Sequence, residues 1–261
     1  MADKKSNIAL EARLRNCANV LTLGVRPNFS DYTPEEKSLI RNAPRIYYPS
    51  TFYADMFAAT GKPIFPSVHT YRFVQDKIKQ SALFALMDIP TPRTRTFYGR
   101  KRLEKVLSHF DFPMVGKVPR GSALGRGVFL FNTPDDLVRY LAICQPAYIQ
   151  EYLPIDRDLR ILVIGGRIIC AYWRIAYPGE FRTNVGQKGR IAFDPVPPEA
   201  AALALHTAAV CGWDDVGLDI CFCAGTYYVL EANMKYGRQG LVEAGIDYSE
   251  MMEEMIEKRQ I

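Results

Sequence analysis

Two strand-like segments separated by a short turn, at 216–223 and 227–234, constrain this chain more than any other feature. Side chains on a β-strand alternate between two faces, so each segment sorts into two rows. One row is almost entirely apolar and is predicted to face the core: Val216, Leu218, Ile220, Phe222, Tyr228, Leu230, Ala232 and Met234. The other row carries every hard oxygen donor of the segment: Asp219, Glu231 and Asn233. A turn centred on Gly225 places Asp219 directly opposite Glu231 in a β-hairpin.

The facing carboxylates of Asp219 and Glu231 need a partner, because like charges opposite each other destabilise a β-ladder. A divalent cation would convert that repulsion into coordination. Mg²⁺ in particular is usually held by one or two carboxylates together with substrate phosphates. The alternative is an arginine or lysine from another element that neutralises the pair.

Length and composition describe an ordinary globular chain of 261 residues, 48% hydrophobic and 23% charged, which is enough for a sizeable core and two domains. No run approaches the ~18 apolar residues of a membrane helix, because Arg167 and Arg174 interrupt the most apolar region. The first residues lack an apolar signal core and the six cysteines lack disulfide spacing, so we expect a cytoplasmic protein with reduced thiols. Three widely spaced histidines argue against a histidine metal site or a Ser-His-Asp triad.

The order of predicted elements indicates an α+β fold with antiparallel hairpins. Before a proline-punctuated linker at 89–92, the pattern predicts strands at 19–25 and 45–48 and helices from Thr33, over 51–59 and over 73–87. After the linker it predicts further helices over 101–109, 133–144, 198–212 and 247–259, and further strands over 113–118, 127–131, 147–152, 158–164 and 167–174.

A glycine-rich loop follows Lys117 and connects two predicted strands. Its glycines, Gly121, Gly125 and Gly127, let the backbone approach an anion closely. The segment is not a Walker loop, which needs a Lys-Ser/Thr pair leading into a helix. A flexible turn without a ligand is the alternative.

A second basic segment lies between Arg174 and Arg190 and contains one acid, Glu180. It includes Arg182 and Asn184. A loop that faces phosphate and a plain basic surface explain this composition equally well. The overall net charge of +5 is modest and identifies no partner by itself.

Two further features are ambiguous when taken singly. Lys77 opens the helix before the linker, where a surface lysine is the default interpretation. The apolar strand that ends with Gln150, Glu151, Tyr152 and Leu153 is stopped by a proline, and it fits either an ordinary core strand or a hinge beside an adenine ring.

The order of these features resembles the ATP-grasp superfamily, and most closely its RimK-type branch, which includes the ligase that adds glutamate to a small-subunit ribosomal protein. The resemblance covers about 45–247. Its strongest matches are Lys77, Lys117, Asp158-Leu-Arg160, Phe181-Arg182-Thr-Asn184 and Glu231-Ala-Asn233. A set of motifs in the expected order is far more specific than any one of them.

The resemblance implies an ATP-grasp fold, in which two α+β subdomains clamp ATP, preceded by a short N-terminal α/β unit. We expect the N-terminal unit over 1–72 and the ATP-grasp domain over 73–261. Within that domain the small subdomain is expected at about 90–150 and the large subdomain at about 151–261.

The resemblance also assigns roles to residues. The ATP phosphates would contact Lys77, Lys117, Gly121 and Gly125. The adenine would lie against Gln150, Glu151, Tyr152 and Leu153, and Asp158 would hold the ribose hydroxyls. Mg²⁺ or Mn²⁺ would be bound by Asp219, Glu231 and Asn233. The γ-phosphate and the acyl phosphate would face Arg174, Arg182 and Asn184.

The implied reaction is that of an ATP-dependent carboxylate–amine ligase of class EC 6.3. ATP phosphorylates a carboxylate, an amine then attacks the acyl phosphate, and ADP and phosphate are released. The partners would be a small-molecule or peptide carboxylate and an amine acceptor. The main alternative is an ATP-binding regulatory or assembly protein that keeps the fold without turnover. A kinase that acts on a hydroxyl has no specific support.

Two departures from the family pattern motivate that alternative. The N-terminal region offers only about two strands, where a fuller unit is usual. The segment 234–240 stands where such ligases commonly have a Ser-Pro-Gly-like turn. In it, Lys235, Tyr236 and Arg238 indicate either an anionic or carboxylate-bearing substrate or a solvent-exposed loop.

Other partners are weakly indicated. Nucleic-acid binding rests only on the mild basic charge and ranks last, because Lys and Arg gather where the ATP phosphates would lie. The aromatic residues Tyr47, Tyr48, Phe52 and Tyr53 are predicted to expose an apolar face that supports a homo-oligomer.

Overall fold

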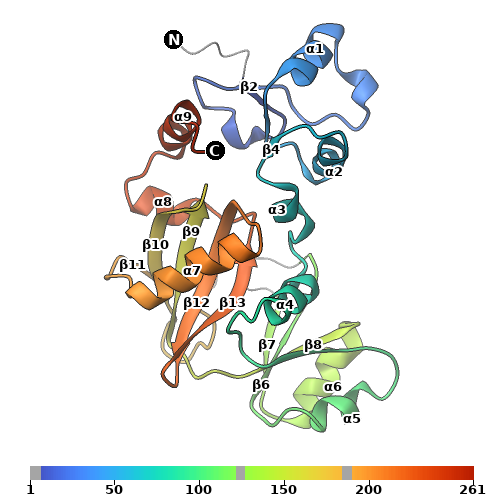
Figure 1. The fold of residues 1–261 in the computed structure, drawn as a ribbon. Coiled ribbons are helices and arrows are strands. Elements are labelled where there is room, and N and C mark those ends of the chain that lie inside the picture. The colour runs from blue at the N-terminus through green and yellow to red at the C-terminus, as the bar shows by residue number, and fades with distance from the viewer. Residues whose placement is uncertain (1–6, 122–126, 184–189) are drawn as a thin grey trace.

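The computed structural model describes residues 7–121, 127–183 and 190–261 of the chain. Two predicted site residues, Gly125 and Asn184, lie outside these described ranges. The described elements form three β-sheets. Figure 1 shows a small α/β unit at the top, a five-stranded sheet in the middle and a four-stranded sheet with two helices at the bottom.

The N-terminal unit is a parallel sheet in the order β2 (Leu21–Thr22), β1 (Ile8–Ala9), β3 (Ile46–Tyr47) and β4 (Ile64–Phe65). Single 3₁₀ turns lie at Ala12–Leu14 and Phe29–Asp31, and the helices are α1 (Pro34–Asn42) and α2 (Thr51–Ala59). A capping box between Thr33 and Glu36 starts α1, as the sequence predicts. The predicted α/β character is confirmed, but the expected count of two strands is wrong. The strands are two residues long, which is too short for alternation to reveal β1 and β4 in the sequence.

The N-terminal unit shares a hydrophobic core with the C-terminal helix α9 (Tyr248–Glu257). Tyr47 and Tyr48 belong to this core, and Tyr53 is buried within the unit itself. Of the predicted aromatic face only Phe52 is exposed, at 60%. The predicted apolar surface is therefore wrong, because Tyr47 and Tyr48 pack in a core with α9, about 200 residues away in sequence, and Tyr53 packs inside its own unit.

The small subdomain is an antiparallel sheet in the order β5 (Thr94–Phe97), β8 (Ala147–Glu151), β6 (Met114–Lys117) and β7 (Val128–Phe131). Helices α5 (Arg102–Leu107) and α6 (Pro134–Ile143) pack against it. The Tyr140 hydroxyl donates to the Lys117 carbonyl at 2.7 Å and accepts from the Tyr148 amide at 3.0 Å. This contact fixes the end of β6, where Lys117 projects.

The large subdomain is an antiparallel sheet in the order β11 (Arg190–Ala192), β10 (Arg167–Ile175), β9 (Arg157–Ile164), β12 (Asp215–Cys223) and β13 (Thr226–Asn233). Helix α7 (Pro198–Val210) covers one face of this sheet in Figure 1, and α8 (Gln239–Glu243) lies near its upper end. The connection from the N-terminal unit contains α3 (Val68–Arg72) and α4 (Lys77–Leu86). The predicted helix over 73–87 starts later than expected, because Asp76 caps α4 by accepting from the Lys79 amide.

The predicted hairpin register is confirmed at the residues that matter most. Asp219 pairs with Glu231, and Gly217 pairs with Asn233. A bulge follows, so that Ile220 pairs with Val229. A one-residue insertion turns the following side chains to the other face. Val229 is therefore fully buried in the core and Leu230 lines a cavity, which makes the predicted faces of 227–230 wrong.

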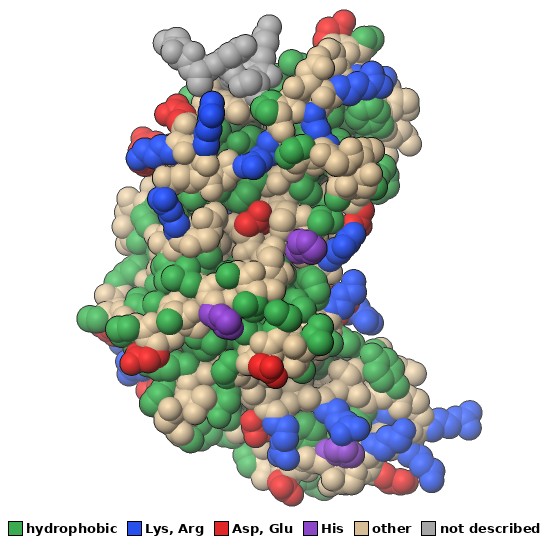
Figure 2. Space-filling model, in the orientation of Figure 1, with side chains coloured by type: hydrophobic (Ala, Val, Ile, Leu, Met, Phe, Trp, Pro, Cys, Tyr) green, Lys and Arg blue, Asp and Glu red, His purple; other side chains and the backbone are tan. Residues whose placement is uncertain are grey.

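Basic side chains are concentrated on the small subdomain. From Arg93 to Lys105 the chain carries six Lys and Arg against Glu104 alone, an excess of five that equals the net charge of the whole chain, +5. Figure 2 shows Lys and Arg side chains gathered at this lower end. None of the six lines the cavity between the two larger sheets, so this cluster is separate from the predicted cations that do line it, Lys77, Lys117, Arg174 and Arg182.

The described cysteines, six in all, are free thiols, as predicted. Within the described ranges no helix is long and apolar enough to cross a membrane.

Candidate active site

A cavity of about 150 Å³ lies between the small sheet and the large sheet. It brings together segments that are far apart in sequence, from the start of α4 to the end of β13. The predicted site residues that line it are Lys77, Lys117, Gln150, Glu151, Tyr152, Leu153, Asp158, Arg174, Arg182, Asp219, Glu231 and Asn233. Gly121 does not line it.

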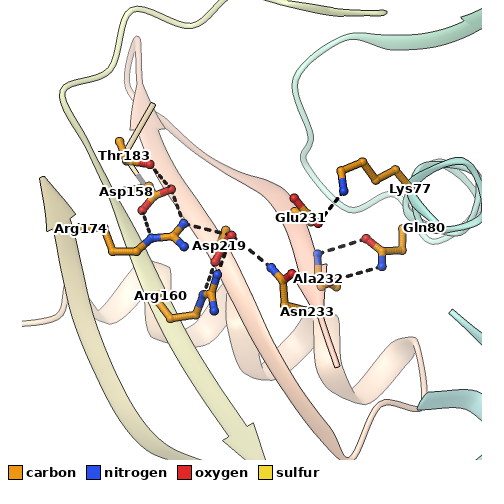
Figure 3. A network of polar contacts seen from close by, with 10 residues as sticks. All are labelled: Lys77, Gln80, Asp158, Arg160, Arg174, Thr183, Asp219, Glu231, Ala232 and Asn233. Carbon is orange, nitrogen blue, oxygen red and sulfur yellow. Dashed lines mark hydrogen bonds and ion pairs between the residues drawn. The ribbon is translucent and has the colours of Figure 1, made fainter. Parts of the chain in front are cut away.

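Asp219 is surrounded by two arginines (Figure 3). Arg160 is its direct neighbour across β9 and β12, and donates from Nε and Nη2 to the two carboxylate oxygens, with Nη2 at 3.0 Å from Oδ2. Arg174 Nη2 lies 3.0 Å from the same Oδ2 atom. Burial opposes ionisation of Asp219, but the two guanidinium groups outweigh it and hold the pKa of this carboxyl below its usual value.

Asp158 holds Arg174 from the other side. Arg174 donates to Asp158 from Nε at 2.7 Å and from Nη2 at 2.5 Å. The Thr183 hydroxyl adds a bond of 2.6 Å to Asp158 Oδ2. Because both Asp158 oxygens are engaged and the residue is 2% exposed, this carboxylate orients Arg174 in the described structure. Its predicted contact with a ribose stays a prediction.

Lys77 and Glu231 form an ion pair at the opposite side of the cavity, with Nζ 2.8 Å from Oε1. Lys77 is the first residue of α4 and is buried. One turn later in the same helix, Gln80 bonds the backbone of Ala232, next to Glu231 (Figure 3). Helix α4 is thereby fixed on the edge of β13, and Lys77 reaches the carboxylate row, that is, the side chains of Asp219 and Glu231.

Lys117 is the one buried lysine in the described structure without an ion-pair partner there. It is 8% exposed and ends β6 inside the cavity. Burial lowers the pKa of its ammonium group, and attraction to Glu231 offsets this only in part. A buried and unpaired cation is a strong anchor for an anionic ligand.

The other end of the cavity combines apolar walls with a few polar groups. Val115, Leu153 and Ile155 contribute apolar surface. Gln150 is held by a bond of 2.9 Å from its Nε2 to the Thr94 hydroxyl, and Glu151 accepts from the Arg93 amide at 2.6 Å. An apolar slot with few fixed polar groups suits a flat heterocycle.

Glu180 holds Arg182 at the rim of the cavity. Arg182 donates from Nε to Oε1 at 3.0 Å and from Nη2 to Oε2 at 2.8 Å. These hydrogen bonds lower the pKa of Glu180 to about 2, so the carboxylate stays ionised. Arg182 is thus oriented before any ligand arrives.

Gly121 lies outside the cavity but close to α4. Its amide donates to the Gln75 carbonyl at 3.3 Å, and the Lys77 amide donates to the Pro119 carbonyl at 2.9 Å. Its φ of +66° is one that glycine adopts without strain. The turn after β6 is therefore tied to the start of α4.

Sequence reasoning missed Arg160 and Thr183 as site residues. The sequence did contain a sign of Arg160, because Asp158 and Arg160 are two residues apart in a predicted strand and so project from the same face as each other. Its partner Asp219 became visible only when β9 and β12 were paired. Thr183 carries no such signal, since a single threonine in a loop has no preferred partner.

The donor set around Asp219 suits a metal that arrives with phosphates. Within the described ranges no cluster of three or more His, Cys, Asp or Glu side chains could hold an ion alone. Asp219, Glu231 and Asn233 instead offer two carboxylates and an amide, and Asn233 lies 3.2 Å from Asp219. Mg²⁺ prefers hard oxygen ligands and usually completes its shell with substrate phosphate and water. The residues therefore fit a nucleotide-bound Mg²⁺. Without it, Arg160, Arg174 and Lys77 neutralise the pair, as the alternative in the sequence analysis anticipated.

The sequence of this domain matches a known family. A profile of the RimK-like ATP-grasp domain covers residues 74–256. The chain belongs to the RimK-like ATP-grasp family. The predicted family is confirmed, and the matched range contains every predicted site residue.

Curated relatives of this RimK-like chain are named probable alpha-L-glutamate ligases. The one from Alkalilimnicola ehrlichii is 31% identical over 77% of this chain and 70% of its own length. The one from Parasynechococcus marenigrum is 29% identical over 83% of this chain. That match spans 49% of the relative, so this chain spans about half the length of that protein.

The solved ATP-grasp ligase PsnB, complexed with a minimal precursor, has a similar fold. Its TM-score is 0.71 at 18% identity, over 99% of this chain and 100% of that chain. The predicted ATP-grasp fold and ligase class are confirmed. The subdomain boundaries and the roles of single residues stay predictions.

Proposed function

We propose that this RimK-like chain uses ATP to join L-glutamate to a peptide or small-molecule partner through an amide-type bond. The observation that carries the proposal is the cavity in which buried Lys117, without an ion-pair partner in the described structure, faces the carboxylates of Asp219 and Glu231. The names of the curated relatives support glutamate as one substrate, and a solved complex of PsnB with a precursor peptide supports a peptide as the other.

In this proposal Lys117 and Lys77 bind the ATP phosphates. Lys77 starts α4 and Lys117 ends β6, and both side chains are buried, so the backbone that carries each ammonium group is already in place when the nucleotide binds. Gly121 and Gly125 belong to the connection between β6 and β7, which would approach the phosphates through its backbone. The adenine would lie between the apolar walls near Leu153.

Asp219, Glu231 and Asn233 would hold Mg²⁺, or Mn²⁺. The ion would supply charge neutralisation to the phosphates during transfer. Arg160 and Arg174 keep Asp219 ionised, so the ligand is ready in its charged form. Lys77 pairs with Glu231 at 2.8 Å and is placed to exchange that carboxylate for a phosphate oxygen.

Arg174, Arg182 and Asn184 would face the transferred phosphoryl group. In the first step a carboxylate oxygen bonds to the γ-phosphorus of ATP, and the bond from that phosphorus to ADP breaks. In the second step the amine nitrogen bonds to the acyl carbon and loses a proton, and phosphate leaves. The fixed guanidinium groups stabilise negative charge that moves from the nucleotide to the acyl phosphate.

The test is ADP release from Mg²⁺-ATP in the presence of L-glutamate and pooled peptides, carboxylates and amines. We expect release to require both glutamate and one pool, and the product mass to equal the two substrates less one water. Glu231→Gln is expected to abolish turnover. A protein that gains thermal stability from Mg²⁺-ATP but releases no ADP with any pool would instead be a regulatory ATP-binding protein.

A further inference from the structure

A second cavity, of about 430 Å³, lies between the N-terminal unit and the segment that follows Asn233. It shares no lining residue with the cavity described above. The two are neighbours along the chain, because Asn233 lines the first and Lys235 lines the second. Its lining includes the polar side chains of Glu11, Arg13, Tyr71, Lys235 and Arg238.

Arg13 lies in an aromatic cage at this cavity. Its guanidinium is 4.6 Å from the ring centre of Tyr236 and 5.3 Å from that of Tyr248. Its Nε donates to the Tyr248 hydroxyl at 2.9 Å and lies 3.9 Å from the buried Asp215. These contacts hold the side chain in one orientation.

The same guanidinium has a buried nitrogen that is not used. Arg13 Nη2 has no hydrogen-bond partner in the part of the chain that the structure describes. The hydroxyl of Tyr71, another lining residue, likewise donates to no group in the described structure, and Tyr71 is 6% exposed. Buried polar groups are almost always satisfied, so two unsatisfied donors at one cavity indicate an acceptor that the described residues do not supply.

The charge of the cavity defines that acceptor. Arg13, Lys235 and Arg238 contribute three positive charges, against one lining carboxylate, Glu11. Asp215 lies behind Arg13, where the Tyr48 and Tyr236 hydroxyls donate to it at 2.7 Å and 2.5 Å. The excess positive charge that remains faces the cavity and favours an anion.

Glu11 gives the cavity a second recognition element. Burial raises the pKa of this carboxyl, although Lys235 and Arg13 oppose the shift. No ion pair of Glu11 occurs among the described residues. A carboxylate beside three cations matches a ligand that carries an ammonium group as well as negative charge.

We propose that this second cavity binds the glutamate substrate, with a carboxylate on Arg13 Nη2 and the Tyr71 hydroxyl and the ammonium group on Glu11. The inference rests on the proposed function and adds the residues that choose the substrate. Lys235 and Arg238 surround the second carboxylate. The cavity starts one residue after the metal-binding Asn233, so a glutamate held there is adjacent to the phosphate end of the first cavity.

A purely structural role for Arg13 makes different predictions. Its bond to Tyr248 and its proximity to Asp215 would join the N-terminal unit to α9 without using Nη2. Under that interpretation, removing the Tyr71 hydroxyl would change no ligand affinity and would leave stability equal or higher. The ligand interpretation predicts lost glutamate affinity at unchanged stability.

The experiment is calorimetric titration of the full-length chain with L-glutamate, with ATP titrated separately. We expect Tyr71→Phe to weaken glutamate binding at least fivefold and Arg13→Lys at least tenfold. Lys235→Met is expected to weaken it about threefold. ATP affinity should stay within twofold in every variant, and the exposed Arg167→Met is the matched control for loss of one positive charge.

Two other ligands test the ammonium contact. Glutarate lacks the ammonium group, so it should bind the wild type at least fivefold more weakly than L-glutamate does. The Glu11→Gln variant should bind glutarate and L-glutamate with equal affinity. L-Glutamine, which lacks the second carboxylate, should bind weakly to both.

The outcomes separate this inference from the proposed function. If the wild type binds ATP but not L-glutamate, or if Tyr71→Phe and Arg13→Lys bind glutamate as well as the wild type does, the second cavity is not the substrate site. Ligase turnover could still be observed in that case. If ATP itself does not bind, the proposed function fails first.

Discussion

Gln80 bonds both polar backbone groups of Ala232: its Nε2 donates to the Ala232 carbonyl at 2.8 Å, and its Oε1 accepts from the Ala232 amide at 3.2 Å. Strand β13 is the last strand of the large sheet, so this amide group replaces a neighbouring strand at an open edge. The contact lies beside Glu231 and one helical turn from Lys77. It therefore couples the position of α4 to the geometry of the carboxylate row.

Gln80→Leu should lower the free energy of unfolding by about 1–3 kcal/mol, because two buried backbone groups lose their partner. We also expect the KM for ATP to rise, since Lys77 and Glu231 are no longer held in register. Urea denaturation and initial rates at varied ATP measure the two effects. The control is Gln239→Leu, which removes an exposed side chain that bonds Glu243 at 2.9 Å. Equal stability of both variants would contradict the role given to Gln80.

Arg160→Met should destabilise the protein by about 3–5 kcal/mol, because it leaves the buried Asp219 with one cation fewer. The double variant Arg160→Met/Asp219→Leu should recover part of that loss, since the uncompensated charge is then absent. Chemical denaturation of the single and double variants provides a double-mutant cycle. A double variant no more stable than Arg160→Met would show that the ion pair is not the source of the effect.

The loss of unfolding free energy at acidic pH should depend on Asp219. Its folded pKa lies below the ordinary value of 3.8, because Arg160 and Arg174 outweigh burial. The unfolded chain therefore binds the proton first, and the stabilisation is fully present above about pH 4 and lost as the pH falls through the folded pKa. Unfolding free energies measured from pH 6 down to pH 2 should fall less steeply for Asp219→Asn than for the wild type. Parallel curves would contradict the assignment.

The sequence predicted the parts of the site that depend on local spacing. The Asp219–Glu231 pair is as predicted, although the pairs nearer the turn are not. Cys223 pairs with Thr226, whereas a turn centred on Gly225 would place it opposite Tyr227. A bulge at Leu230 restores the predicted pairing at Asp219, and alternation does not predict this bulge, because Val229 packs in the core where Leu230 was expected. Local spacing thus identified the facing carboxylates, whereas the register between them and the turn depends on core packing.

The contacts that complete the site join segments distant in sequence. Gln80 and Ala232 are 152 residues apart, and Arg160 and Asp219 are 59 residues apart. No periodicity reports such pairs before the strands are placed. The same holds for Tyr48, which is predicted to be exposed and in fact bonds Tyr248 from α9 at 3.0 Å. A short N-terminal unit gives no sign in its own sequence of what covers it.

Lys117→Met should stabilise the ligand-free protein at pH 7 while impairing its use of ATP. Burial lowers the folded pKa of this ammonium below its ordinary value of 10.5. Between the folded and the unfolded pKa of Lys117, the unfolded chain binds more protons than the folded chain, so the free energy of unfolding rises with pH. Below the folded pKa the full cost of burying the charge remains. Methionine has a similar length without the charge, and we expect a gain of about 1 kcal/mol, the scale of one unmatched buried polar group.

The same substitution should raise the KM for ATP at least tenfold, because a charge-assisted bond to phosphate is lost. Urea denaturation at pH 7 and at pH 10, with and without Mg²⁺-ATP, measures both effects, and the exposed Lys105→Met is the control. The stabilising effect of the substitution should shrink at pH 10 and reverse when ATP is present, since only the wild type then pairs its buried cation. If Lys117→Met were instead less stable without ligand and bound ATP normally, the buried lysine would have a structural role and the phosphate site would have to lie elsewhere.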